Sequence, residues 1–104
     1  MNEPREILQG EIFEEMSVLD LDELSRLCAA DRAVIAALAE EGVLAMIQTR
    51  GGQRQFAGSS LRRARTALRL QRQFELSIAG VALVLELMDE LNALRRQIEG
   101  RNPE

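Results

Sequence analysis

The ionisable side chains of this chain are carboxylates and guanidinium groups, with one thiol. Its 104 residues include 17 Asp or Glu and 13 Arg, whereas His and Lys do not occur and Cys28 is the single cysteine. Histidine is the commonest general base and metal ligand, and Cys28 has no second thiol or imidazole to join it. The sequence contains neither a glycine-rich nucleotide loop nor a nucleophile elbow. We therefore expect a binding protein, not an enzyme, with no cofactor and no metal.

The charges are segregated along the sequence. Residues 1–49 carry eleven acids and three Arg, residues 50–73 carry seven Arg and no acid, and residues 74–104 carry six acids and three Arg. Such separation indicates opposed charged surfaces or segments that pair with each other. The exclusive use of Arg fits bidentate contacts to carboxylate or phosphate, and it fits equally a genome-wide preference for Arg.

The segment from Phe74 to Ile98 predicts one long helix over residues 77–99. At about 100° per residue, its apolar side chains divide into two stripes. The leucine stripe contains Leu83, Val84, Leu87, Leu91, Leu94 and Ile98, and the second stripe contains Ile78, Val81, Leu85 and Met88. One stripe can pack on the rest of the chain, but the other needs a second copy of the chain or another protein to cover it, and we expect a homodimer. The sequence leaves open which stripe forms it. Glu86, Asp89 and Glu90 fall together on the remaining arc of this helix.

Shorter elements precede this helix and favour a mainly α fold. A first helix begins at Asp20 or Asp22, and a second follows Asp31, so residues 20–42 predict a helix-turn-helix. Gly51-Gly52 predicts the turn of a β-hairpin over residues 43–56, and a third helix follows over residues 60–74. The predicted core positions are Leu21, Leu24, Leu27 and Cys28 in the first helix, Val34, Ile35, Leu38 and Ala39 in the second, and Leu61, Ala64, Ala67, Leu68 and Phe74 in the third. Residues 1–17 are expected to form a loosely ordered acidic arm, and residues 18–100 a single domain.

The sequence also bears on the compartment. No positively charged start is followed by a long apolar run, and one cysteine excludes an internal disulfide. The longest apolar stretch, Ile78 to Leu85, is far shorter than the ~20 residues that cross a bilayer. We expect a cytoplasmic protein without a membrane segment.

The order helix-turn-helix, hairpin, linking helix and long C-terminal helix resembles the transcription regulators of the MerR class. A closer resemblance is to a small offshoot of that fold, the chaperone modulator CbpM family. It rests on Gly42-Val43-Leu44, Phe56, Arg69-Leu70, Gly80, Ala82 and Leu87-Met88-Asp89-Glu90-Leu91. This resemblance implies a MerR-like winged helix-turn-helix. It also implies a regulator that binds the J-domain of a CbpA/DnaJ-like co-chaperone and blocks its stimulation of DnaK, and it raises an effect on that protein's DNA binding.

An acidic surface on the C-terminal helix is the first of two candidates for partner contact. J-domains resemble one another in presenting a basic helix to DnaK, so an inhibitor needs a competing acidic surface beside apolar groups. The hypothesis that follows is that Glu86, Asp89 and Glu90 bind that helix, with Leu83 and Leu87 at the edge.

The alternative is a MerR-like DNA-binding transcription regulator. It would use Arg50 and Arg54 of the hairpin together with Arg62 and Arg65, the first members of a basic stripe on the third helix that continues to Arg69 and Arg72. The second helix ends in Glu40-Glu41 and offers no base-reading Asn or Gln, which counts against nucleic acid as a partner.

Overall fold

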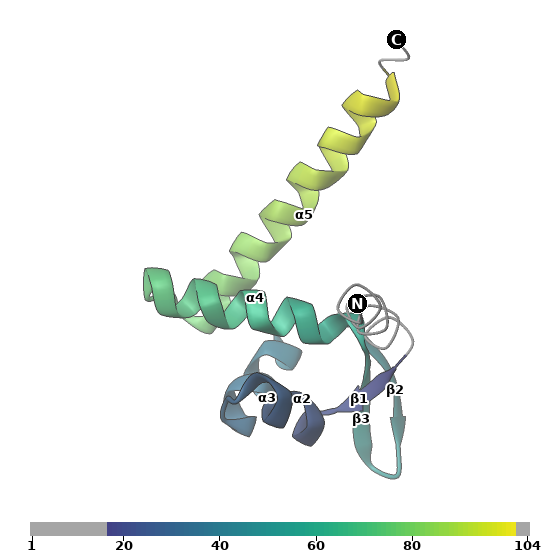
Figure 1. Cartoon of the computed structure of the whole chain (residues 1–104), viewed down its shortest axis with the longest axis vertical. Helices are drawn as coiled ribbons and strands as arrows, with labels where there is room; N and C mark the ends of the chain where they lie inside the picture. The colour runs from purple at the N-terminus through teal and green to yellow at the C-terminus, as the bar shows by residue number, and fades with distance from the viewer. Residues whose placement is uncertain (1–16, 102–104) are drawn as a thin grey trace, which may run out of the picture.

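Four helices and three strands make up residues 17–101, the part of the chain that the computed structural model describes. In chain order they are β1 (Val18–Asp20), α2 (Leu21–Cys28), α3 (Arg32–Glu40), β2 (Met46–Arg50), β3 (Gln53–Ala57), α4 (Ser59–Phe74) and α5 (Ile78–Arg101) (Figure 1). The predicted mainly α fold, with a helix-turn-helix, a hairpin and a long C-terminal helix, is confirmed. The predicted acidic arm lies outside the described residues, apart from Ser17. Within residues 17–101, no helix is long and apolar enough to span a bilayer.

The helix-turn-helix is defined by its local capping interactions. A reciprocal capping box opens α2: the backbone N–H of Glu23 donates to Asp20 Oδ1 (2.8 Å), and the backbone N–H of Asp20 donates to Glu23 Oε1 (2.9 Å). Ala29 ends this helix in the left-handed region at φ 52°. Asp31 stands at the N-cap of α3, but its side chain makes no capping hydrogen bond. The connection between the two helices is therefore as short as the sequence predicts.

The hairpin is part of a three-stranded antiparallel sheet with the order β1-β3-β2. Gly51 and Gly52 both have positive φ (59° and 80°), which suits the tight turns that join two twisted strands. The sequence predicts a hairpin over residues 43–56, whereas the strands begin at Met46 and the preceding Val43 and Leu44 are buried in the core. Strand β1 is not predicted from the sequence, and it pairs with β3 from Val18 to Asp20.

The core lies where α2, α3, α4, β3 and the first half of α5 meet. Its largest fully buried apolar side chains are Phe56, Leu24, Ile35, Leu38 and Val81. Two predicted core positions are wrong: Leu27 is 43% exposed and Phe74 is 63% exposed. Phe74 is the last residue of α4, beyond the turns that face the core. The C-terminal half of α5 extends away from this body (Figure 1).

Candidate partner-binding surface

The two apolar stripes of α5 have different environments. In the second stripe, Val81 is fully buried and Leu85 is 2% exposed, so this stripe attaches α5 to the rest of the domain. Met88, one turn further on, is already 41% exposed. In the leucine stripe, the five residues Leu83, Leu87, Leu91, Leu94 and Ile98 are between 48% and 65% exposed. A row of large apolar side chains of this length is unusual on a lone domain and marks an interaction surface.

An acidic groove runs between the end of α3 and the first half of α5. Its charged and apolar walls are Glu41 and Val43 after α3, Arg63 of α4, and Leu83, Glu86 and Asp89 of α5. The segment from Glu41 to Val43 lines the groove because Gly42 adopts a positive φ (78°) and turns the backbone after α3. Three of the five predicted partner-binding residues, Leu83, Glu86 and Asp89, therefore share one concavity.

The other two predicted residues lie beside the groove. Glu90 is exposed one turn beyond Glu86, and Leu87 is exposed as an i, i+3 neighbour of Glu90 on the helical surface. Glu41 is a member of the groove that sequence reasoning missed. It is 45 positions before Glu86, and no local periodicity links the two residues. The acidic end of the second helix was the only signal for it.

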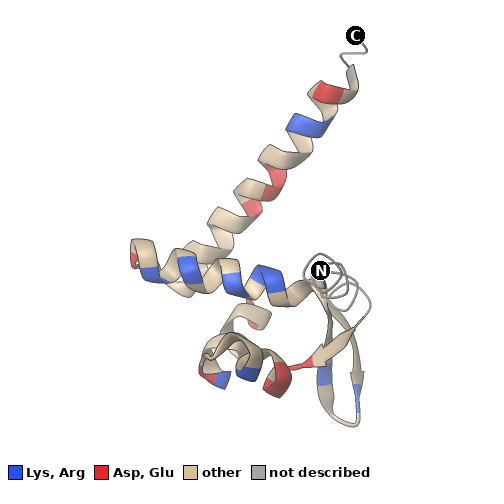
Figure 2. Cartoon of the chain, in the orientation of Figure 1, with Lys and Arg blue, Asp and Glu red and all other residues tan. Residues whose placement is uncertain are grey.

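Among the three acids predicted to bind the partner, Asp89 forms an ion pair within the chain. Arg63 donates from Nη1 to Asp89 Oδ1 (3.2 Å) and from Nη2 to Asp89 Oδ2 (2.8 Å). The same guanidinium donates from Nε to the carbonyl oxygen of Val43 (2.6 Å). In Figure 2, Arg positions recur along α4 and acidic positions occupy the middle of α5. The acidic arc predicted on α5 is therefore partly neutralised within the chain.

The residues of the nucleic-acid alternative lie on three elements, the two strands of the hairpin and α4. Arg50 and Arg54 are at the end of β2 and the start of β3, and Arg62 and Arg65 are exposed on α4. Arg54 is paired with Glu40 at the end of α3 (3.1 Å). The structure thus places a carboxylate of the second helix directly against one of the Arg side chains that would approach phosphate.

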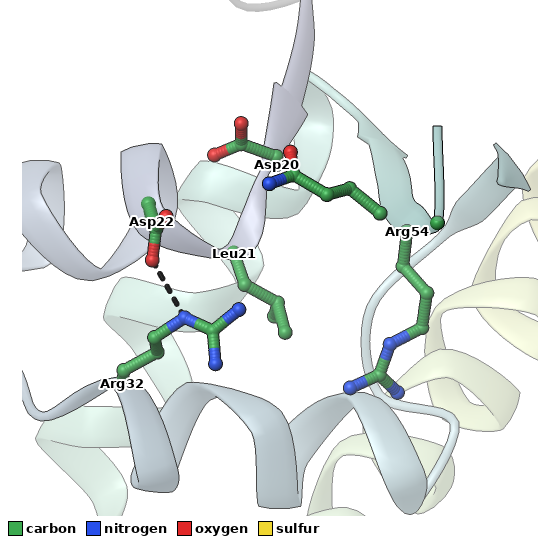
Figure 3. A pocket seen from close by; sticks show the side chains of 7 residues that line it. Asp20, Leu21, Asp22, Arg32 and Arg54 are labelled. Carbon is green, nitrogen blue, oxygen red and sulfur yellow. Dashed lines mark hydrogen bonds and ion pairs between the residues drawn. The ribbon is translucent and has the colours of Figure 1, made fainter. Parts of the chain in front are cut away.

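A small pocket separates the turn of the hairpin from the starts of α2 and α3 (Figure 3). Arg32 and Arg54 line it together with Asp20 and Asp22. Arg32 Nε donates to Asp22 Oδ1 (2.6 Å), an exposed ion pair drawn as a dashed line in Figure 3. Both Arg side chains of this pocket are consequently engaged with carboxylates, so the pocket provides no uncompensated positive charge.

Cys28 packs against the edge of the core and is half-buried. Burial raises the pKa of its thiol above the ordinary value, and the positive charge of Arg65 opposes that change. A thiol that keeps its proton is a weak nucleophile and a weak metal ligand. Over residues 17–101, no three His, Cys, Asp or Glu side chains are grouped so that they could hold a metal ion.

Comparison with known proteins places this architecture among regulators. Chaperone modulatory proteins CbpM from Coxiella burnetii strains Dugway 5J108-111, RSA 331 / Henzerling II and CbuG_Q212 are each 28% identical to the chain over 94 residues, covering 90% of this chain and 89% of the relative. This similarity confirms the resemblance seen in the sequence. The family model described as MerR HTH family regulatory protein matches residues 19–102, which is most of the chain. The chain therefore belongs to the MerR helix-turn-helix family of regulatory proteins.

Proposed function

We propose that this protein is a chaperone modulator that binds the J-domain of a CbpA/DnaJ-like co-chaperone and inhibits the stimulation of DnaK. The similarity to CbpM proteins over nearly the whole chain supports this role. The structural observation that carries it is the exposure of Glu86 and Glu90 beside exposed Leu83 and Leu87 on one side of α5. This surface has the charge and the apolar character needed to cover a basic helix.

The mechanism is occlusion. Carboxylates at the rim of an interface steer a basic partner and set its orientation, and adjacent apolar side chains add affinity when water is excluded. Glu41, which follows α3, and Glu86 of α5 line the same acidic groove, so a Lys or Arg side chain entering there would meet carboxylates from both segments. While the basic helix is covered in this way, DnaK cannot bind it. No covalent step is required, and the protein acts without being an enzyme.

The test is calorimetric titration of the protein into the isolated J-domain, at low and high salt. We expect saturable binding that weakens with salt, because exposed charges are screened. The combined change of Glu86, Asp89 and Glu90 to Ala should weaken binding by roughly 10-fold, since exposed charge pairs contribute about 0.2–1 kcal/mol each. The matched control is Glu99→Ala, which removes an exposed acid from another side of the same helix. Unaltered affinity of the triple variant would contradict the assignment of this surface.

A homodimer is the second part of the proposal. The second stripe of α5 packs on the chain itself, so we assign dimerisation to the leucine stripe. Within that stripe, Leu91, Leu94 and Ile98 lie furthest from the acidic groove. Leu83 and Leu87 lie nearer to it and remain assigned to the J-domain. Binding of the partner should then not require dissociation of the dimer, which light scattering of the complex would measure.

The competing function is that of a MerR-like DNA-binding transcription regulator, with which the family match is compatible. It would rely on Arg50 and Arg54 of the hairpin and on Arg62 and Arg65 of α4. The ion pair between Arg54 and Glu40 weighs against it, because bringing phosphate to that site would place it beside a carboxylate. Titration with duplex DNA at several salt concentrations decides the matter: tight binding with a steep salt dependence would revive this function.

A further inference from the structure

Arg63 joins three segments that are distant in the sequence. It lies in the first half of α4, and its side chain is 32% exposed. One edge of the guanidinium donates to the carbonyl oxygen of Val43, 20 positions earlier, and its other nitrogens donate to both carboxylate oxygens of Asp89, 26 positions later. We call this set of three hydrogen bonds the Arg63 clamp. It connects the segment after α3, helix α4 and helix α5.

The clamp is located where the apolar attachment of α5 ends. Leu85 is the last buried residue of α5, and Asp89 follows one helical turn later. Beyond Asp89, no residue of α5 up to Gly100 is buried. The Arg63–Asp89 pair is the outermost polar contact between α5 and the rest of the described chain. The pair therefore restrains the tilt of α5 at the point where the apolar packing of this helix stops.

The geometry of the Arg63 clamp restrains the direction of α5 better than a simple surface ion pair would. A guanidinium is planar and presents its N–H groups in a fixed fork, so a bidentate bond to a carboxylate defines direction as well as distance. The additional bond to a backbone carbonyl holds the plane of the fork against the body. A lysine at this position keeps the charge but cannot donate to both acceptors in one plane.

The consequence for the rest of α5 follows from its length. The helix continues sixteen residues beyond Leu85, to Arg101, which is about 24 Å at 1.5 Å per residue. A tilt of roughly 10° about Leu85 would thus displace the helix end by about 4 Å. The same tilt would change the separation of Glu41 and Glu86 across the acidic groove.

We propose that Arg63 is a positioning residue, which sets the direction in which α5 leaves the domain and thereby the shape of the acidic groove. In this arrangement Asp89 acts on the direction of α5 through its bond to Arg63. The inference concerns the geometry of the chain alone, so it stands whether or not the J-domain is the partner.

The test measures the direction of α5 by pulsed electron–electron double resonance, which gives the distance between two spin labels. Spin labels are placed on cysteines introduced at Thr49 of β2 and Glu99 of α5, both exposed, in a Cys28→Ser background. Labelled protein is diluted with unlabelled protein so that only distances within one chain are recorded. The parent should give one narrow distance distribution.

Arg63→Ala and Asp89→Asn should each shift or broaden that distribution by several ångströms, about 4 Å for a 10° tilt. The double variant should show no more change than Arg63→Ala alone, because the bonds to Asp89 are already lost in that variant. Arg63→Lys should also shift the distribution, which separates the fork geometry from charge alone. Arg69→Ala removes an exposed Arg from the same helix and should leave the distribution unchanged. Circular dichroism confirms that each variant is folded, and Asp89→Asn alters only an exposed side chain. If Arg63→Ala and Asp89→Asn both retain the parent distribution, the proposal is overturned.

Discussion

Replacement of Leu94 by Glu should convert the protein from a dimer to a monomer. Leu94 is in the leucine stripe, is 55% exposed, and lies nine residues beyond the last buried position of α5. The variant therefore places a charge in the proposed dimer interface without disturbing the core. Because the side chain makes few contacts in the isolated chain, we expect the free energy of monomer unfolding to change by no more than about 0.5 kcal/mol.

The size of the effect follows from the exposed fraction of the side chain. Complete burial of a leucine is worth about 1.5–3 kcal/mol, so burying the exposed half contributes about 1 kcal/mol in each copy. Leu94→Ala should accordingly cost about 2 kcal/mol per dimer, a roughly 30-fold rise in the dissociation constant. Leu94→Glu should cost more, because the dimer would also have to desolvate two unpaired carboxylates.

Sedimentation velocity over a dilution series measures this directly. The parent should change from dimer to monomer with dilution, Leu94→Ala should do so at a roughly 30-fold higher concentration, and Leu94→Glu should remain monomeric. Asn92→Glu is the matched control, since it adds the same charge at an exposed position about 160° around the helix from Leu94. A parent that is monomeric at every concentration, or an unchanged dissociation constant for Leu94→Glu, would refute the assignment of the stripe.

Three further predictions concern the stability and chemistry of the domain. Leu85→Ala should lower the free energy of unfolding by about 2–5 kcal/mol in a denaturant titration, because it leaves a cavity where α5 meets the core. Leu91→Ala, at an exposed position, is the control for unfolding of the monomer. Asp20→Ala should cost about 1 kcal/mol by removing the capping box with Glu23; no change in the denaturation midpoint would show that the box is dispensable. Because burial raises the pKa of the Cys28 thiol, the unfolded chain releases this proton at a lower pH than the folded chain. The free energy of unfolding should therefore fall as the pH rises above the ordinary thiol pKa. At neutral pH the thiol should alkylate more slowly in the folded protein than in urea, and equal rates would contradict the assigned environment.

Local signals accounted for most of the secondary structure. Asp20 with Glu23 marks the start of α2 because both hydrogen bonds of the capping box lie within four residues. Gly51-Gly52 marks the hairpin turn because few other residues adopt two successive positive φ values. Strand β1 was not predicted because three residues are too few for a periodic pattern. It is defined only by its pairing with β3.

The errors have a common origin. Leu27 and Phe74 satisfy the helical spacing of the buried residues, yet both are exposed. Spacing identifies which residues share a face of a helix, but it does not show where along the helix the neighbouring elements stop covering that face. Met88 illustrates the same limit in α5, where the body ends before the apolar stripe does.

The sequence by itself determined the helices, the hairpin turn, the two stripes of α5 and the segregation of charge, because each depends on residues within a few positions of one another. The tertiary structure alone decided that Val81 and Leu85 of the second stripe are buried and that the leucine stripe is exposed. It also placed Glu41 and Glu86 in the same groove and paired Asp89 with Arg63. These outcomes depend on how α4 and α5 cross above the helix-turn-helix. That crossing is set by the packing of Val81 and Leu85 against residues far away in the chain, which no local pattern encodes.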